Sequence, residues 1–165
     1  MRLTIIIGLA AVLLMTAAVV GEEEAPWFDM ENCGFCKFLL EDPELLPNTT
    51  WEHHHISNGA VSVTTVKEGF KESLAKAMAQ MDETGKRMEA GEEVPMCGMC
   101  QAWGALMAKG AKFELVETIH GDVVLTTGDT PELIAEIQAF ATRTTEELAK
   151  MEAAMKAEMK EHEGH

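Results

Sequence analysis

The chain lacks the motifs that identify several large classes of enzymes. It has no phosphate-binding glycine loop, no Gly-x-Ser-x-Gly nucleophile turn, no His-Glu-x-x-His zinc-protease motif and no Cys-x-x-Cys-His haem attachment site. No motif therefore supports nucleotide-dependent, hydrolytic or haem chemistry. We expect a function based on binding, storage or delivery in preference to catalytic turnover.

Positive charge is also scarce. The 165 residues include 13 Lys and Arg against 28 Asp and Glu, a formal net charge of −15. Such a chain repels nucleic acid and anionic lipid and attracts cations. The composition therefore argues against polyanionic partners and favours a metal ion as the ligand.

A long apolar run occurs only at the start of the chain. Residues 3–20 are apolar or neutral, Arg2 is the only charge before Glu22, and small residues stand at Ala17, Ala18 and Gly21. This layout is typical of a secretory signal peptide, and an uncleaved anchor is the alternative because eighteen residues barely suffice to span a membrane. We predict a signal peptide over residues 1–21 and a periplasmic or secreted mature chain that has no membrane contact. Without Arg2, its formal charge is 12 − 28 = −16.

The remaining sequence contains two similar segments in tandem. Two Cys-Gly-x-Cys motifs lie 97 − 33 = 64 residues apart, residues 58–65 match residues 120–127 at a shift of 62, and residues 86–90 resemble residues 149–153. Matching features in the same order indicate an internal duplication. We predict a first unit over residues 22–91 and a second over residues 92–165, joined near Gly85–Pro95 into one compact domain.

Each unit has the same expected order of elements. A short helix (36–40 or 100–107) is followed by a hairpin with its turn at Asn58-Gly59 or His120-Gly121 and then by a long helix. In the second unit Thr130 and Pro131 form a helix start. The sequence therefore predicts an α+β fold, in which tandem α-β-β-α units form a four-stranded antiparallel sheet covered by helices.

The four cysteines carry the candidate chemistry. They form two close pairs, Cys33 with Cys36 and Cys97 with Cys100. If the two units pack around a twofold axis, all four sulfurs meet in a tetrahedral site for zinc or, because thiolates are soft ligands, for Cu(I). Two redox-active dithiols and two structural disulfides are the alternatives, and an oxidising compartment favours both of them.

A short sequence resemblance supports the redox alternative. The stretch Cys33-Gly34-Phe35-Cys36-Lys37 resembles the Cys-Gly-x-Cys-Lys motif of thioredoxin-like oxidoreductases over five residues. A thiol-disulfide oxidoreductase would use Cys33 and Cys97 as the attacking thiols, because each is the cysteine nearer the start of its expected helix. Thioredoxin-like chains place a strand before the dithiol, whereas an acidic leader precedes it here and a hairpin follows. Neither the fold nor the mechanism of that family therefore carries over.

Histidine and methionine supply auxiliary candidate ligands. In the first hairpin His53 and His55 share one face and could chelate a metal ion, whereas His54, which matches Val116, is expected on the face covered by helices. The thioethers of Met78, Met81 and Met88 are expected in the core. The other candidates flank Cys97 or follow one face of the C-terminal helix into the tail: Met96, Met99, Met151, Met155, Met159, His162 and His165.

The leading interpretation is an exported protein that binds zinc or Cu(I) through Cys33, Cys36, Cys97 and Cys100. An exported oxidoreductase is the second. The third is an interaction module with structural disulfides, in which the sheet face that carries Trp51 and Phe113, or the methionine-lined tail, binds a protein partner.

Overall fold

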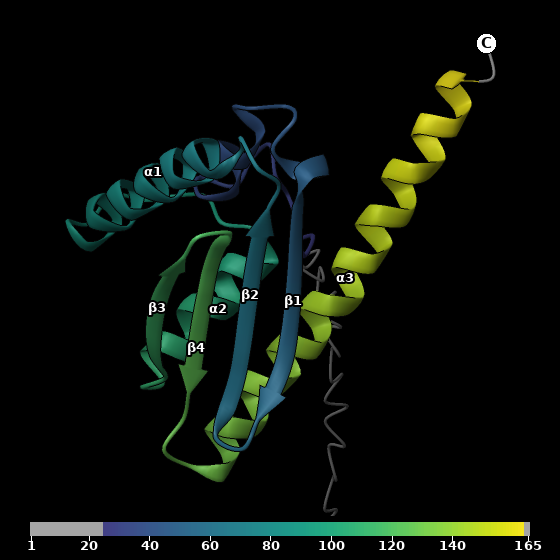
Figure 1. The fold of residues 1–165 in the computed structure, drawn as a ribbon. Helices are drawn as coiled ribbons and strands as arrows, with labels where there is room; N and C mark the ends of the chain where they lie inside the picture. Colours follow the sequence, from purple (N-terminus) through teal and green to yellow (C-terminus); the bar gives the residue numbers. More distant parts are fainter. Residues whose placement is uncertain (1–24, 164–165) are drawn as a thin grey trace, which may run out of the picture.

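The computed structural model describes residues 25–163, so the predicted signal peptide lies outside the described residues. The described part is an α+β fold with a four-stranded antiparallel sheet, as the sequence predicts (Figure 1). Its elements in chain order are the 3-10 helices η1 (Cys36–Leu40) and η2 (Leu46–Asn48), strands β1 (Thr49–Ile56) and β2 (Gly59–Val66), helices α1 (Lys71–Glu89) and α2 (Gly98–Ala108), strands β3 (Lys112–Thr118) and β4 (Gly121–Thr127), and helix α3 (Pro131–Glu163). Among these helices, none is long and apolar enough to cross a membrane.

The sheet consists of two hairpins joined edge to edge. The strand order is β1-β2-β4-β3, and every neighbouring pair is antiparallel. The first hairpin pairs Ile56 with Gly59, and the second pairs Thr118 with Gly121. Each two-residue turn therefore lies one position earlier than predicted, and each glycine begins a strand instead of ending a turn.

These two glycines occupy equivalent places at the junction of the hairpins. Gly59 pairs with Thr127, and Gly121 pairs with Thr65. A Cβ atom would lie 2.0 Å from the Thr126 carbonyl oxygen at Gly59 and 2.1 Å from the Thr64 carbonyl oxygen at Gly121. The equivalence agrees with a twofold relation between the hairpins, whereas the tandem duplication itself stays a prediction.

Two helices cover one face of the sheet. Ile137 and Leu133 of α3 pack with Leu106 of α2 and Ala60 of β2, and α3 then continues beyond the sheet (Figure 1). The predicted start of α3 is confirmed, since the Thr130 hydroxyl accepts a hydrogen bond of 3.2 Å from the backbone N–H of Leu133.

Helix α1 packs mainly on the segment around η1. Leu74 and Ala77 form a core cluster with Leu45 and Val66. Met78 and Met88 are exposed, so their expected core role is wrong, and Met81 is half-buried. The buried residues of α1 are Leu74, Ala77 and Thr84. Because α1 runs to Glu89, the connection between the units begins later than the predicted Gly85.

The faces of β1 are the reverse of those expected. The His55 ring lies 2.9 Å from the Gln138 carbonyl oxygen of α3, so His53 and His55 share the side that faces the helices. His54 is exposed on the other side beside Glu52. The expected position of His54 is therefore wrong, because its match, Val116, is itself 43% exposed.

Replacing Gly59 or Gly121 by alanine should lower the free energy of unfolding by about 2 kcal/mol or more, since the added methyl group meets backbone that cannot move independently. Gly85 of α1 is the matched control, because a Cβ atom there meets nothing within 4 Å. Gly85→Ala should raise the free energy of unfolding by about 0.5–1 kcal/mol. Urea unfolding followed by circular dichroism measures all three, and equal effects at Gly59 and Gly85 would contradict the close approach of β2 and β4.

His53 should make stability depend on pH. Burial, assisted by the nearby charge of His54, lowers the pKa of His53 below its usual value of about 6.5. The unfolded chain therefore binds more protons below about pH 6.5, and the free energy of unfolding falls as the pH drops through that range. Urea titrations at several pH values should show a smaller fall for His53→Gln than for the wild type. The exposed turn variant His120→Gln should match the wild type, and an unchanged slope in His53→Gln would refute this source of pH dependence.

Candidate metal centre

The four cysteine sulfurs converge in one cluster. Cys33 precedes η1, Cys36 begins it, Cys97 caps α2 and Cys100 lies in the first turn of α2. Sulfur–sulfur distances are 3.6 Å from Cys33 to Cys100, 3.7 Å from Cys36 to Cys97 and 3.6 Å from Cys36 to Cys100. All four sulfurs lie within 4.8 Å of one another. The two motifs thus form a single site.

These distances fit a tetrahedral metal ion better than a disulfide. Zinc–thiolate bonds of about 2.3 Å give tetrahedral sulfur–sulfur edges of about 3.8 Å. A disulfide needs sulfurs about 2.05 Å apart. All four cysteines are free thiols, so the disulfide alternative is not present in the described residues.

The cluster is largely protected from water. Cys33, Cys36 and Cys97 are 1%, 3% and 2% exposed, and Cys100 is half-buried. Side chains of Met30, Phe35 and Met99 pack around them. A bound ion would therefore have solvent contact mainly along the side of Cys100.

Both motif glycines allow close backbone approach. Gly34 donates a hydrogen bond of 2.8 Å to the Pro95 carbonyl oxygen, and Gly98 donates one of 2.9 Å to the Pro26 carbonyl oxygen. A Cβ atom would lie 2.3 Å from Val94 Cγ1 at Gly34 and 3.0 Å from the Ala25 carbonyl oxygen at Gly98. A side chain at Gly34 would therefore displace the Val94 side chain, and one at Gly98 would press on the backbone at Ala25.

Backbone N–H groups favour negative charge on two of the sulfurs. Burial raises the pKa of Cys33. Hydrogen bonds to its sulfur have the opposite effect and are stronger together, so the pKa is about 7; the donors are the backbone N–H groups of Cys36, Cys97 and Phe35 and the thiol of Cys100. Burial raises the pKa of Cys97, although N–H groups of Cys100 and Asp29 oppose that effect. Such N–H···S contacts fix the orientation of thiolate ligands.

The sulfurs also compete with one another for the proton. The pKa of Cys36 is raised by its hydrogen bond with Cys100, by burial and by the negative charges of Cys100 and Cys33. Four thiolates at this separation repel strongly in a dry site. A cation at the centre would remove that repulsion and allow all four thiols to ionise.

The structure separates the histidine candidates from the cysteines. His53 Nδ1 lies 2.8 Å from Ser62 Oγ, and His55 Nε2 lies 3.0 Å from Thr142 Oγ1. Both histidines therefore have protein partners at one ring nitrogen. Among the side chains that the structure describes, the four cysteines are the one group of three or more His, Cys, Asp or Glu residues with metal-ligand spacing.

Only some of the candidate methionines lie at the cysteine cluster. Met99 packs on the cysteine cluster, whereas Met96 contributes its carbonyl oxygen to a hydrogen bond from Gln101. Met155 is half-buried near the far end of α3. The side chains of Met159 and His162, and His165 as a whole, lie outside what the structure describes.

The sequence did not indicate the role of the segment before the first motif. Met30 packs on the sulfurs, and the Trp27 carbonyl oxygen accepts a hydrogen bond of 3.0 Å from Met99. The buried Trp27 ring lies 5.7 Å from the Phe140 ring and 4.1 Å from the Arg143 guanidinium carbon. Trp27 thus joins the cysteine site to α3.

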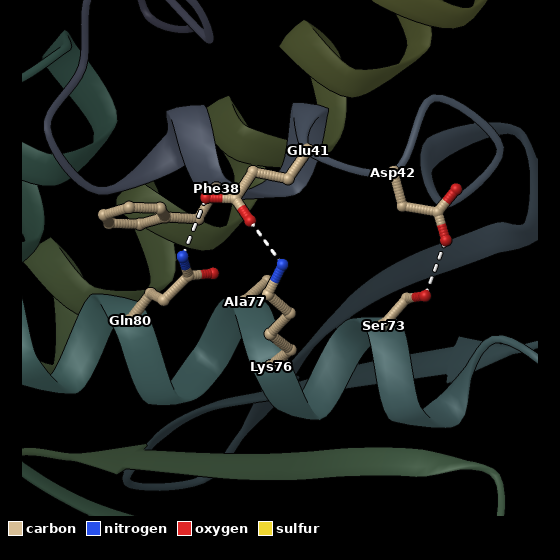
Figure 2. A pocket seen from close by; sticks show the side chains of 7 residues that line it. All are labelled: Phe38, Glu41, Asp42, Ser73, Lys76, Ala77 and Gln80. Carbon is tan, nitrogen blue, oxygen red and sulfur yellow. Dashed lines mark hydrogen bonds and ion pairs between the residues drawn. The ribbon is translucent and has the colours of Figure 1, made fainter.

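A small pocket lies between η1 and α1, and hydrogen bonds join the two helices across it. Its cavity is about 70 Å³ and is lined by Phe38, Glu41, Asp42, Ser73, Lys76, Ala77 and Gln80 (Figure 2). Glu41 accepts hydrogen bonds from Lys76 at 2.8 Å and from Gln80 at 2.7 Å, and Asp42 accepts one from Ser73 at 2.5 Å. These hydrogen bonds hold the η1 segment on α1. The Gln80 Oε1 oxygen is buried without a hydrogen-bond partner among the described residues.

Removing one ligand should largely abolish tight metal binding. Cys36→Ser should weaken zinc affinity by more than about a hundredfold, since even the loss of an outer-shell contact costs about 10–100-fold. Gly98→Ala should fall in that 10–100-fold range, because its methyl group displaces the segment at Ala25. Competition with a chromophoric chelator measures the affinities. Gly104→Ala is the control from the same helix, as a Cβ atom there meets nothing within 4 Å. Unchanged affinity in Cys36→Ser would show that the four cysteines do not act together.

Comparison of this chain with protein-family models, with curated proteins and with solved structures finds no match. The chemistry of the site is therefore argued from the geometry of its own four cysteines.

Proposed function

We propose that this chain is an exported metal-binding protein that holds one zinc ion through Cys33, Cys36, Cys97 and Cys100. The observation that carries the proposal is the set of sulfur–sulfur distances of 3.6–3.7 Å, close to the edge of a zinc–thiolate tetrahedron. The N–H groups directed at Cys33 support it, because they lower the pKa of that thiol to about 7 and stabilise its thiolate.

The role of the ion follows from the completeness of the ligand set. Structural zinc sites use four protein ligands, whereas catalytic zinc keeps a position open for water or substrate. Four cysteines fill a tetrahedron, so the site binds its ion without turnover. The ion would tie the segment around Trp27 and the start of η1 to the start of α2.

Cu(I) is the alternative metal. Thiolates and thioethers are both soft ligands that suit Cu(I), and the side chains of Met30 and Met99 pack on the sulfurs. Zinc is the better fit because Zn²⁺ takes four thiolates in a tetrahedron without a further ligand. The acidic chain would raise the local concentration of either ion without choosing between them.

Thiol-disulfide exchange is less well supported. An attacking thiol must be accessible to its partner. Cys33 and Cys97, the attacking thiols expected for that function, are almost fully buried. The site instead favours metal retention, and a bound ion would protect the thiolates from oxidation in an exported protein.

The export part of the proposal rests on the apolar run of residues 3–20 and on the small residues that end at Gly21. An exported protein meets oxidising conditions, in which four adjacent free thiols would not persist. A zinc ion bound during or before export would explain how the cysteines stay reduced.

Metal analysis of protein purified without oxygen from the exporting compartment tests the proposal. We expect about one zinc per chain, four thiols that react with a thiol reagent only after a chelator is added, and an intact mass that lacks residues 1–21. Cu(I) in place of zinc would select the alternative metal. Metal-free protein with four oxidised cysteines would overturn the proposal.

A further inference from the structure

The open face of the sheet is unusually apolar at its centre. Val61 and Val63 of β2 pair with Leu125 and Val123 of β4, and all four point away from α2 and α3. The two helices lie on the other side of the sheet (Figure 1), and the buried core clusters of the described residues contain none of these side chains. The centre of the open face is thus a continuous aliphatic block.

The polarity of the two central strands is reversed relative to an ordinary solvated sheet. An antiparallel sheet with one exposed face usually places its polar residues on that face. Here the side that faces the helices carries Ala60, Ser62 and Thr64 of β2 and Asp122, Val124 and Thr126 of β4. The more apolar side is the uncovered one. Such a pattern indicates that another surface covers it.

We propose that this open face is a homodimer interface, in which two copies of the chain stack their sheets into an eight-stranded sandwich. Two sheets that pack face to face keep their strands roughly aligned, about 10 Å apart. The aliphatic block would supply the apolar centre of the interface, and the polar residues around it would supply the rim.

The rim is complementary to a second copy of itself. One row across the sheet runs from His54 through Val61 and Leu125 to Glu114, so an imidazole and a carboxylate stand at its two ends. The imidazole also contacts Glu52 of its own strand at 3.2 Å. A twofold axis parallel to the strands would place His54 above the partner's Glu114 and repeat the same contact at the other end. Such self-complementarity is what a twofold interface requires.

Charge and area both permit this contact. The formally charged residues of the open face are Lys112, Glu52 and Glu114, which sum to 1 − 2 = −1, against −16 for residues 22–165. Two acidic chains could therefore meet there with little repulsion. Four strands of seven or eight residues cover on the order of 500 Å² per copy, or about 1,000 Å² in total, the lower limit for a specific interface.

Sedimentation equilibrium of the zinc-loaded protein, purified from cells that express the full chain, tests the interface across the micromolar range. We expect a reversible monomer–dimer equilibrium in the wild type. Val63→Asp places a charge in the aliphatic block and should weaken dimerisation at least tenfold. Leu115→Asp is the control, because Leu115 is 45% exposed but lies on the opposite side of the sheet. This control should keep the wild-type equilibrium.

A charge exchange at the rim avoids changes to the sheet centre. Glu114→Lys should weaken the dimer, and the double variant His54→Glu with Glu114→Lys should restore it. Circular dichroism and zinc content verify that each variant is folded and loaded, so a lost dimer is separable from a lost metal site. A wild type that stays monomeric, or a dimer that persists in folded Val63→Asp, would overturn the proposal. Equal weakening by Leu115→Asp would overturn it as well.

Discussion

The close approach of four cysteine sulfurs, three of them on buried residues, is the constraint on which the arrangement of this chain depends. Three of the four cysteines have almost no contact with water, and their sulfurs lie closer together than thiolates tolerate without a cation. The cluster is stable either as protonated thiols or around a metal ion. N–H groups aimed at Cys33 bring its pKa to about 7, whereas burial keeps the pKa of Cys97 raised despite the N–H groups that oppose it. The backbone thus favours the ionised form at Cys33.

The consequences of that cluster extend into the helix layer. The segment that contains Trp27 has no strand or helix of its own, yet its carbonyl oxygens accept hydrogen bonds from the start of α2 and its indole ring packs on α3. The positively charged Arg143 guanidinium lies over the same ring and forms a cation–π contact with it. Metal binding at the cysteines would therefore stabilise the packing of α2 and α3 on the sheet as well as the segment around Trp27.

Sequence patterns predicted the elements well and their faces less well. Cysteine spacing, the Val- and Thr-rich hairpins and the start of α3 at Thr130 and Pro131 are local signals, and each led to the observed element. The convergence of the sulfurs was expected from the repeated motif, but it depends on packing between residues more than sixty positions apart, so disulfides and separate dithiols remained open. The contributions of Met30 and Trp27 carry no local signal, because nothing in an irregular segment shows which residues it will contact.

The error at His54 has a physical origin. Apolar residues on one side of a strand predict a covered side, and Val61 and Val63 lie on the side of His54. Within one chain that rule fails, because α3 covers the side that carries Ser62 and His53. Helix packing there relies on small and hydrogen-bonded residues, such as Ala60 and the His55 contact to Gln138, which let α3 approach closely. The apolar pattern would still be informative if burial were counted over an assembly of two chains, since each side of the sheet would then be covered.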